Sequence, residues 1–445
     1  MDEILDNSRI FKVHRWSDYP EVRGLTAHLL GRLFSSFPNP KVKYVRGKAL
    51  RVLLLDLFCS YVEDSSQFIA IGLSKNRYVV GERYNKLFLR YEPIKKCLNK
   101  LVEYGLVEMV VGDKSPNPAN RRLTRIRATE ALQGLFRDAE WKAGCAFDTL
   151  ADEIIIVRDP DTKELIDYED NRFTAQIRHD LERYNQFISN YHIGFSFNGV
   201  GFFDPPQFRS DVVQFRRIFL DKSFECGGRF YCGHYQNVDK RWRQFITLNG
   251  EPTIEIDYGA LHPTLAYAKV GHDFLSESGG IDIYMPDRFD YDDETYGQYR
   301  SLVKETTLAL LNADSEVSAT RAVMSKLKEH YKDRKHGDPD LIKTFYPLGV
   351  TYKEVQELIE WIKAQHPIIH QLFAQDLGRH FQFIDSQIAN RVLTRMMNEG
   401  RPALPVHDSF ICCEGDAQAL RSAMQDCFNE QLREIGFTPI QIRLK

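Results

Sequence analysis

The stretch Glu255-Ile256-Asp257-Tyr258-Gly259-Ala260-Leu261-His262-Pro263 decides the fold of this chain. From Pro252 to Ile256, β-branched and polar residues alternate, which is typical of a strand. From Leu261 to Ala268, apolar residues recur three and four positions apart, which is typical of a helix. Asp257 therefore lies where a strand gives way to a helix. This position suits a carboxylate that holds a metal ion in a fixed place, although N-capping is the commoner role of such an aspartate.

A second stretch, Val406-His407-Asp408-Ser409-Phe410, places another aspartate after a short apolar strand. Between the two lies a predicted helix from about Tyr296 to Ala313, in which the four-residue spacing of Arg300 and Lys304 puts both on one face. Two carboxylates can hold a pair of divalent ions about 3.5–4 Å apart, and paired cations can meet a triphosphate. The pattern predicts a phosphoryl-transfer site. Taken alone, the two cations are more typical of a solvated helix face.

Composition sets the wider frame. A length of 445 residues predicts two or three domains, and 43% hydrophobic residues is ordinary for a globular protein. Neither a signal-peptide pattern nor an apolar run of about 20 residues is present, and the eight cysteines show no disulfide spacing. We therefore expect a cytoplasmic protein with reduced thiols and no membrane partner. The net charge of −3 does not itself indicate nucleic-acid binding, but local basic grooves can bind nucleic acid despite such a sum.

For the N-terminal region, residues 1–140, the sequence predicts a helical, winged-helix-like nucleic-acid-binding domain. A strong helix from Ala49 and an amphipathic one from Pro93 to Tyr104 precede two strands, Leu106 to Val111 and Arg121 to Ala128. The wing between these strands would lay four arginines against phosphates. These are Arg121, Arg122, Arg125 and Arg127. The alternative is a winged helix used only for protein packing.

For the rest of the chain, the sequence predicts two further domains. Residues 141–225 are expected to form a helical, thumb-like connector that includes a helix from Ser210 to Phe219. Residues 226–445 carry the residues of the phosphoryl-transfer site and are expected to form the catalytic core.

Several motifs of this core resemble family-A DNA polymerases over about residues 226–415. Gly228-Arg229, Gln236-Asn237-Val238 and Arg243 precede Ile256-Asp257-Tyr258, which resembles motif A; Arg300, Lys304 and Asn312-Ala313 resemble motif B; Val406-His407-Asp408 resembles motif C. The related single-subunit, phage-type RNA polymerases share this palm. Arg229-Phe230-Tyr231, Ser386-Gln387 and His407-Asp408-Ser409 look more like them. Four motifs in one order are a more specific signal than any one of them.

The resemblance implies an α+β fold: a right-hand polymerase with an antiparallel palm sheet, compact fingers and a compact thumb. It implies that Asp257 and Asp408 bind two Mg²⁺ ions, for which Mn²⁺ can substitute, and that Lys304 and Arg300 act on the triphosphate. Nucleotide-binding positions would be Tyr258, His262, Leu308 and Asn312. Positions that bind nucleic acid would be Arg229, Gln236, Gln387 and His407.

The sequence also departs from these families. His262 replaces a glutamate that helps DNA polymerases exclude ribonucleotides, and Asn312-Ala313 replaces a Tyr-Gly pair. Asp385 stands where the RNA polymerases place a histidine near the ribose, and Ser409 replaces a third carboxylate. The choice between dNTP and NTP therefore stays open.

The sequence thus predicts a nucleotidyltransferase that adds nucleotides to a 3′ end on a DNA template and primer, or on RNA. DNA-directed DNA synthesis is favoured by the Gln-Asn segment and by the motif spacing. A primase-like or phage-type RNA polymerase is the alternative that Ser409 and His262 favour. A non-catalytic DNA-binding replication initiator is a further alternative, against which the retained aspartates and cations argue. Template-independent tailing also stays open.

Overall fold

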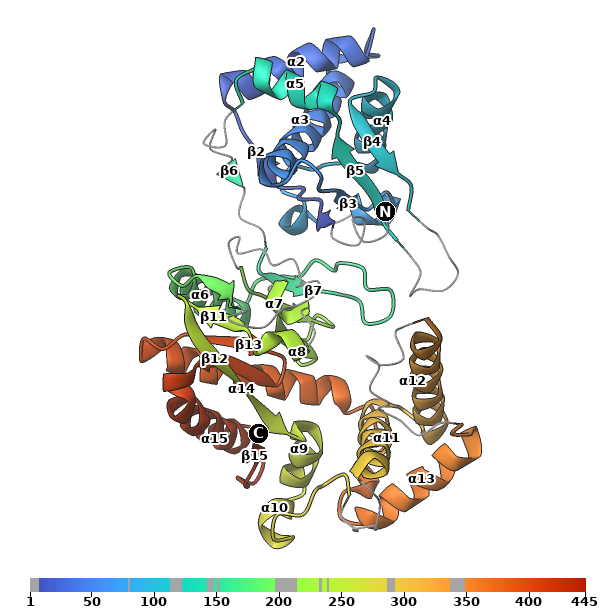
Figure 1. The fold of residues 1–445 in the computed structure, drawn as a ribbon, viewed down its shortest axis with the longest axis vertical. Coiled ribbons are helices and arrows are strands. Elements are labelled where there is room, and N and C mark those ends of the chain that lie inside the picture. Colours follow the sequence, from blue (N-terminus) through green and yellow to red (C-terminus); the bar gives the residue numbers. More distant parts are fainter. Residues whose placement is uncertain are drawn as a thin grey trace. The chain divides into compact units, whose positions relative to one another are not determined.

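The structure is a computed structural model that describes residues 8–78, 81–112, 122–141, 148–149, 153–196, 214–231, 234–237, 240–285, 293–336 and 349–445. The chain has a mixed α/β fold and divides into two compact units, Met1–Glu169 and Asp170–Lys445 (Figure 1). The boundaries expected from the sequence, after residues 140 and 225, stay predictions.

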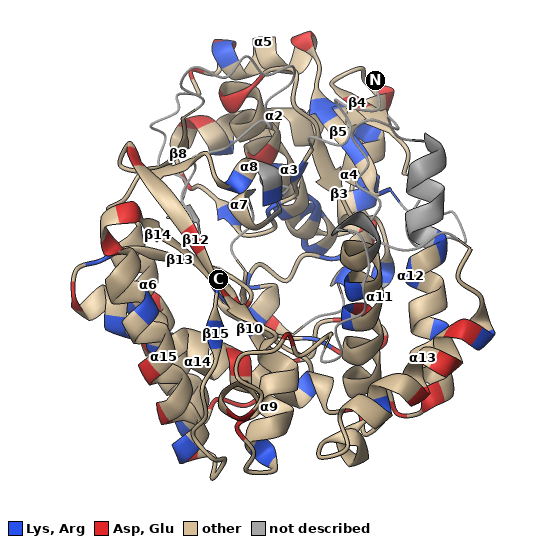
Figure 2. Cartoon of the chain, turned by 60° about the horizontal axis from the view of Figure 1, so that its bottom comes forward, with Lys and Arg blue, Asp and Glu red and all other residues tan. Residues whose placement is uncertain are grey.

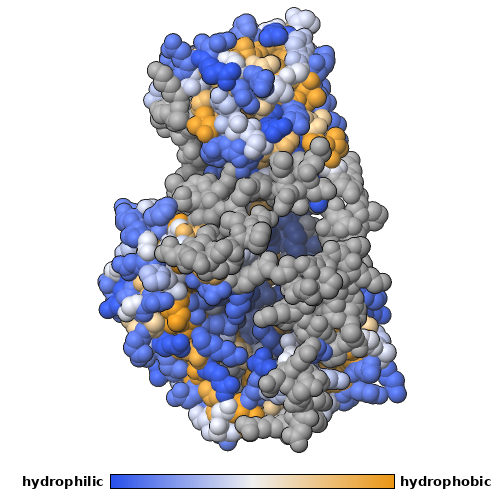
Figure 3. All heavy atoms as spheres, viewed as in Figure 1, coloured by the Kyte–Doolittle hydropathy of each residue, from blue (hydrophilic) through white to orange (hydrophobic). Residues whose placement is uncertain are grey.

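Charged residues of both signs are interspersed along the chain (Figure 2). On the face drawn in Figure 3, the described surface is mainly hydrophilic, with apolar residues in small scattered groups. Among the described helices, none combines the length and apolar character needed to cross a membrane.

The first unit packs helices against a four-stranded sheet of order β1-β3-β5-β4. The strands are β1 (Arg9–Ile10), β3 (Ile69–Ile71), β4 (Val107–Val110) and β5 (Thr124–Ala128), and β2 (Arg15–Trp16) pairs with β6 (Asp148–Thr149). The helices are α2 (Pro20–Leu33), α3 (Pro40–Glu63), α4 (Tyr91–Glu103) and α5 (Glu130–Asp138), with 3₁₀ turns η1 (Lys75–Tyr78) and η2 (Glu82–Tyr84). Their apolar faces form one core of buried residues.

Two helix ends in this unit follow from local chemistry. Helix α3 begins at Pro40, where the Asn39 side chain accepts a hydrogen bond from the Val42 backbone nitrogen at 2.9 Å. The predicted helix from Ala49 therefore starts earlier, because a proline in the first turn needs no N–H partner. After α4, Gly105 has φ +68°, as expected for a C-terminal glycine.

The expected wing lies between β4 and β5, and the arginines of its return strand are engaged within the unit. Arg127 forms an ion pair with Glu108 at 2.6 Å and donates to the Ser66 carbonyl at 3.0 Å. Arg125 donates to the Leu123 carbonyl at 2.7 Å. Arg122 is exposed, and Arg121 lies outside the described residues. Phosphate binding by these four arginines stays a prediction.

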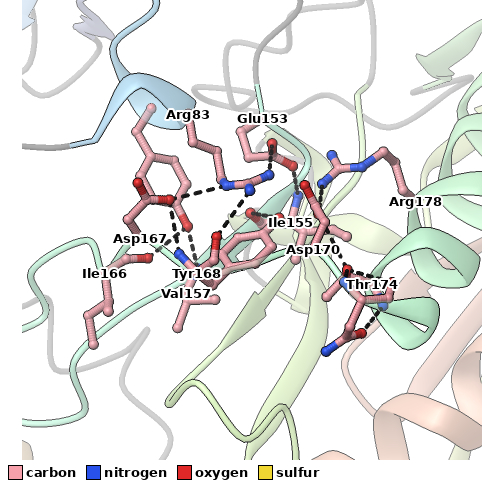
Figure 4. A network of polar contacts seen from close by, with 12 residues as sticks. Arg83, Glu153, Ile155, Val157, Ile166, Asp167, Tyr168, Asp170, Thr174 and Arg178 are labelled. Atoms are coloured by element: carbon pink, nitrogen blue, oxygen red, sulfur yellow. Dashed lines mark hydrogen bonds and ion pairs between the residues drawn. The ribbon is translucent and has the colours of Figure 1, made fainter.

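Arg83 anchors the last segment of the first unit (Figure 4). Its guanidinium contacts Asp167 at 3.2 Å and Glu153 at 3.4 Å, and lies 3.9 Å from the centre of the Tyr168 ring. These contacts tie the segment that contains β7 (Ile155–Val157) to η2. In the second unit, Asp170 and Arg178 form an ion pair at 3.1 Å beside the N-cap of α6 (Arg172–Ile188).

The second unit is built on an antiparallel sheet of order β13-β14-β12-β11-β8, with β15 added to the end of β12. The strands are β8 (Ile193–Phe195), β11 (Ile246–Leu248), β12 (Glu251–Gly259), β13 (Ala403–Val406), β14 (Ser409–Cys413) and β15 (Arg443–Leu444). Helices α14 (Gly378–Asn398) and α15 (Ala417–Glu434) contact one another and the strands β12, β13 and β14 (Figure 1). The strand predicted before Asp257 and the helix predicted after it are confirmed as β12 and α9 (Leu261–Lys269).

A helical group follows α9 in the chain. It consists of α11 (Asp293–Asn312), α12 (Glu316–His336) and α13 (Tyr352–Gln365), which pack on one another. Short helices α7 (His234–Asn237), α8 (Lys240–Arg243) and α10 (Phe274–Glu277) and the 3₁₀ turns η4 (His370–Leu372) and η5 (Glu414–Asp416) complete the described elements of the unit, apart from one hairpin.

That hairpin corrects a prediction. The expected helix from Ser210 to Phe219 is wrong at its C-terminal end, because residues 216–219 form strand β9 (Arg216–Phe219), paired antiparallel with β10 (Gly227–Tyr231). Burial alternates along β9, with Arg217 and Phe219 fully buried. The sequence hides this two-residue period because one of the buried side chains is an arginine.

Candidate active site

The two predicted aspartates lie at the same end of neighbouring strands. Strands β12 and β14 pair so that Asp257 is opposite Ser409, the residue that follows Asp408. Asp408 lies in the tight turn that joins β13 to β14, and its carbonyl accepts a hydrogen bond from the Tyr258 backbone nitrogen at 3.1 Å. The preceding residue, His407, has φ +59°, which the reversal of the chain imposes. Strand register thus brings together two carboxylates that are far apart in the sequence.

Asp257 is a perturbed acid. Burial, and after it the negative charge of Asp408, raises its pKa to about 6, although the charges of Lys240 and Lys304 oppose the rise. A carboxyl group held this way ionises more easily when a cation lies beside it. The helix N-cap of α9 is Ala260, so the alternative capping role of Asp257 is wrong.

The donor set suits divalent ions. Two carboxylates close enough to interact electrostatically, one of them with a raised pKa, match the ligand preference of Mg²⁺, which also takes water and substrate phosphates. Within the described residues, no group of three or more His, Cys, Asp or Glu side chains is arranged as a metal site. Asp257 and Asp408 would therefore be the ligands that the protein contributes.

A third carboxylate lies on the same strand. Glu255 is two residues before Asp257 and so shares its face of β12. The Ser409 hydroxyl donates to Glu255 Oε1 at 2.6 Å, and Arg243 Nε lies 3.4 Å from Glu255 Oε2. Ser409 thus binds a carboxylate on the neighbouring strand. Alternation along the strand is a signal that could have identified Glu255.

Helix α11 carries the two predicted cations, and their surroundings differ. Arg300 is fixed, because Asp282 accepts hydrogen bonds from Nε at 2.5 Å and from Nη2 at 3.3 Å, and the Tyr284 ring lies 5.3 Å below the guanidinium. Lys304, one turn further, is exposed and is near enough to Asp257 to lower the pKa of its carboxyl group. One cation is held rigidly and the other is free to reach a ligand.

Lys445 is a cation of this site that the sequence did not indicate. The Lys445 backbone N–H donates a hydrogen bond to the Asp257 carbonyl at 2.9 Å, and the Asp257 N–H donates one to the Lys445 carbonyl at 3.1 Å. Residues paired in this way project from the same face of an antiparallel sheet. Burial and the charge of Arg300 lower the pKa of the Lys445 ammonium, and both residues line one small pocket. Only strand pairing of β15 brings this lysine here, so no local sequence pattern could have shown it.

A buried carboxylate joins two other predicted residues. Asp385, whose side chain is 1% exposed, accepts hydrogen bonds from Arg229 at 2.9 Å and 2.5 Å and lies 3.2 Å from His262 Nε2. Arg229 is on β10, His262 on α9 and Asp385 on α14. The same carboxylate oxygen, Oδ2, therefore contacts both side chains.

The Gly228-Arg229 and Ser386-Gln387 motifs meet around a buried arginine. Arg217, fully buried, donates to the Gly228 carbonyl at 2.7 Å and to the Ser386 hydroxyl at 2.9 Å. Burial lowers the pKa of this guanidinium to about 9. A Cβ atom at Gly228 would lie 2.8 Å from Ser386 Oγ and 2.7 Å from the Phe219 ring, so the strand can approach α14 this closely only with glycine.

Two predicted nucleic-acid ligands have buried nitrogen atoms without a partner. These are Gln387 Nε2 and His407 Nδ1, neither of which has a hydrogen-bond partner among the described residues. Buried polar atoms normally find partners, so each of these is a candidate contact for a bound molecule. Burial, and after it the charge of Arg229, lowers the pKa of His407, which favours a neutral ring near pH 7.

Other predicted ligands have different surroundings. The prediction that Tyr258 binds the nucleotide is corrected. Tyr258 is 2% exposed and its hydroxyl donates to the Met424 carbonyl at 2.6 Å, so the side chain belongs to the core. Gln236 Nε2 donates to the Phe230 and Pro405 carbonyls at 3.0 and 2.8 Å, which ties β10 to β13. Asn312, exposed at the end of α11, donates to the Leu308 carbonyl at 2.6 Å. Leu308 is partly buried.

Comparisons with known proteins give little further guidance. No protein-family model matches the sequence, and no curated protein matches it. Among solved structures, the chain is similar to the POL domain of Pol1 from M. smegmatis in a complex with DNA primer-template and dNTP. That domain is 13% identical; the alignment covers 99% of this chain and 67% of that one, with a TM-score of 0.29.

Proposed function

We propose that the second unit is a nucleic-acid polymerase that extends a 3′ end on a DNA template, with DNA synthesis as the favoured reaction. The observation that carries the proposal is the arrangement around β12. Asp257 interacts electrostatically with Asp408, with Lys304 and with Lys445. Phosphoryl transfer needs this combination, with carboxylates for metal ions and cations for the phosphates of the substrate.

The residues divide the work by their chemistry. Asp257 and Asp408 would hold divalent ions, which when bound polarise the phosphate and activate the attacking hydroxyl. Two nitrogens of Arg300, Nε and Nη2, donate to Asp282. The third, Nη1, has no hydrogen-bond partner among the described residues and would donate to a phosphate oxygen. Lys304 and Lys445 would neutralise charge on the remaining phosphates. Glu255 would hold Ser409 and Arg243 in place beside the aspartates.

The proposal is tested with one set of extension assays. Primed and unprimed DNA are each supplied with dNTPs or NTPs and Mg²⁺, and products are resolved by length. Extension of primed DNA with dNTPs supports DNA synthesis; synthesis from unprimed DNA with NTPs supports the primase-like alternative. Extension of single-stranded ends without a template indicates tailing. If folded protein gives no product under any of these conditions, the result supports the non-catalytic replication initiator.

Variants make the assay specific to the site. Asp257→Asn and Asp408→Asn should each reduce incorporation by at least a thousandfold, about 4 kcal/mol in the barrier, because each removes a ligand of the ions. Glu251→Gln is the matched control, since it removes a carboxylate from the exposed start of the same strand. Near-normal turnover by Asp257→Asn would exclude the two-metal assignment.

A further inference from the structure

The first unit carries a groove of about 770 Å³. The first two turns of α3 and α4, the residues just before each helix, and η1 form its walls. Its volume is in the range of small-ligand sites. The residues that line it are Pro38, Lys41, Val42, Val45, Arg46, Lys75, Tyr78, Arg90, Tyr91, Glu92, Pro93 and Lys96.

The groove is strongly basic. It is lined by Lys41, Arg46, Lys75, Arg90 and Lys96 but by only one acid, Glu92. Within the described part of the chain, none of the five cations forms an ion pair, whereas Arg127 on the expected wing is paired with Glu108. Lys and Arg residues are visible on α3 and α4 in Figure 2. Unpaired like charges repel one another, so a polyanion in the groove would relieve this repulsion.

The backbone adds to this charge. Both α3 and α4 begin at the groove, and the positive ends of their dipoles add to the potential of the cations. The N-cap of α4 is Arg90, whose side chain makes no capping hydrogen bond. The first backbone N–H groups of a helix have no partner within the helix, so those of Tyr91 and Glu92 suit a phosphate oxygen.

The walls also offer flat and apolar surface. The rings of Tyr78 and Tyr91 lie 6.4 Å apart, and Val42 and Val45 project from the same face of α3. Tyr91 is partly buried, with Lys95 5.4 Å from the centre of its ring. Aromatic rings between cations are typical of sites at which unpaired bases stack while the backbone is neutralised.

We infer that this groove binds single-stranded DNA, with phosphates at the N-terminus of α4 and at the five cations, and with a base against Tyr91. A duplex hides the faces of its bases, so it cannot use the tyrosine in a groove of this kind. The inference does not depend on polymerase activity in the second unit.

The first test measures binding of the full-length chain to a fluorescent 20-nucleotide strand of mixed sequence, by anisotropy at several salt concentrations. The double variant Arg90→Gln/Lys96→Gln should bind at least tenfold more weakly and flatten the plot of log affinity against log salt by about 1.4, since each phosphate contact on a single strand contributes about 0.7. Lys100→Gln/Arg137→Gln is the matched control from the same unit. Equal affinity and slope for both double variants would overturn the inference.

Variants of Tyr91 distinguish the contribution of base stacking to DNA binding from the contribution of charge. Tyr91→Ala should weaken binding of the strand about fivefold to a hundredfold with an unchanged salt slope, and Tyr91→Phe should bind normally. A 20-base-pair duplex should be insensitive to Tyr91→Ala. If the strand is equally insensitive, or if the duplex binds as tightly as the strand, single-strand binding in the groove is wrong.

A third test uses the protein without substitutions, so that its result does not depend on how the variants fold. Lysine acetylation is measured by mass spectrometry with and without the DNA strand. Lys41, Lys75 and Lys96 should be protected, and Lys100 should not. Protein carrying Asp257→Asn should give the same pattern, so failure of the polymerase proposal would not be mistaken for failure of this one. Unchanged reactivity at the three groove lysines would contradict the inference.

Discussion

At the scale of single residues, the raised pKa of Asp257 has a consequence for stability. Its carboxyl group, with a pKa of about 6, binds a proton more tightly in the folded chain than an ordinary aspartate at about 3.9 does. Its stabilising contribution is therefore complete below about pH 4 and is lost as pH rises through about 6.

Asp257→Asn should remove this dependence. Relative to the unmodified chain, the variant should gain about 1–2 kcal/mol between pH 4 and pH 7.5 without divalent ions, a value reduced from the full shift because the group is partly solvated. Urea unfolding in EDTA at the two pH values measures it. An identical stability difference at both values would show that Asp257 titrates normally.

Lys445 offers a second prediction at this scale. Lys445→Gln removes a positive charge facing Asp257 and Arg300, so the KM for the nucleotide should rise about tenfold, equivalent to about 1.4 kcal/mol, with the fold unchanged. Lys353→Gln is the control, because that lysine is 84% exposed on α13. If both variants have the same KM, Lys445 has no role in binding the triphosphate.

Sugar choice is also decided at single residues. A side chain that donates a hydrogen bond to a ribose 2′-hydroxyl would make the site permissive to ribonucleotides, and both His262 and Asn312 can donate. In the structure both have partners inside the protein, Asp385 for His262 at 3.2 Å and the Leu308 carbonyl for Asn312 at 2.6 Å. Asp385→Asn should weaken the hold on His262 and shift the preference between dATP and ATP about tenfold toward ATP. Competition between the two nucleotides on one primed template measures it, and an unchanged ratio would exclude Asp385 from sugar selection.

At the scale of elements, the contact between β10 and α14 depends on a single glycine. Gly228→Ala places a methyl group against Phe219 and Ser386 at a residue with φ +82°, so we expect a loss of about 2–4 kcal/mol in the free energy of unfolding. Gly250→Ala is the matched control, since its φ is +84° but nothing lies within 4 Å of its added Cβ. A larger loss for Gly250→Ala would show that backbone strain, and not packing of the two elements, dominates.

At the scale of the whole molecule, the proposed sites belong to different units. Addition of Mg²⁺ and a nucleotide should slow hydrogen exchange in β12, β14, β15 and α11, because their residues surround the proposed substrate. A short DNA strand without nucleotide should slow exchange at the starts of α3 and α4. Exchange followed by mass spectrometry distinguishes the two patterns, and protection of α3 and α4 by nucleotide alone would contradict this assignment.

The sequence by itself determined features that depend on local spacing. Alternation before Asp257 and the three- and four-residue spacing after it identified β12 and α9, and about one turn separates Arg300 from Lys304 in any helix. The winged-helix and right-hand descriptions stay predictions, because both concern how elements are arranged in space.

Tertiary structure decided what depends on pairing between distant segments. The register of β12 with β14 brings Asp408 beside Asp257, and the pairing of β15 adds Lys445. Pairing with β10 makes residues 216–219 a strand where a helix was predicted, and packing against Phe410 and Phe428 places Tyr258 in the core. These outcomes depend on partners far away in the chain, and a local pattern carries no information about which distant strand or helix a residue will meet.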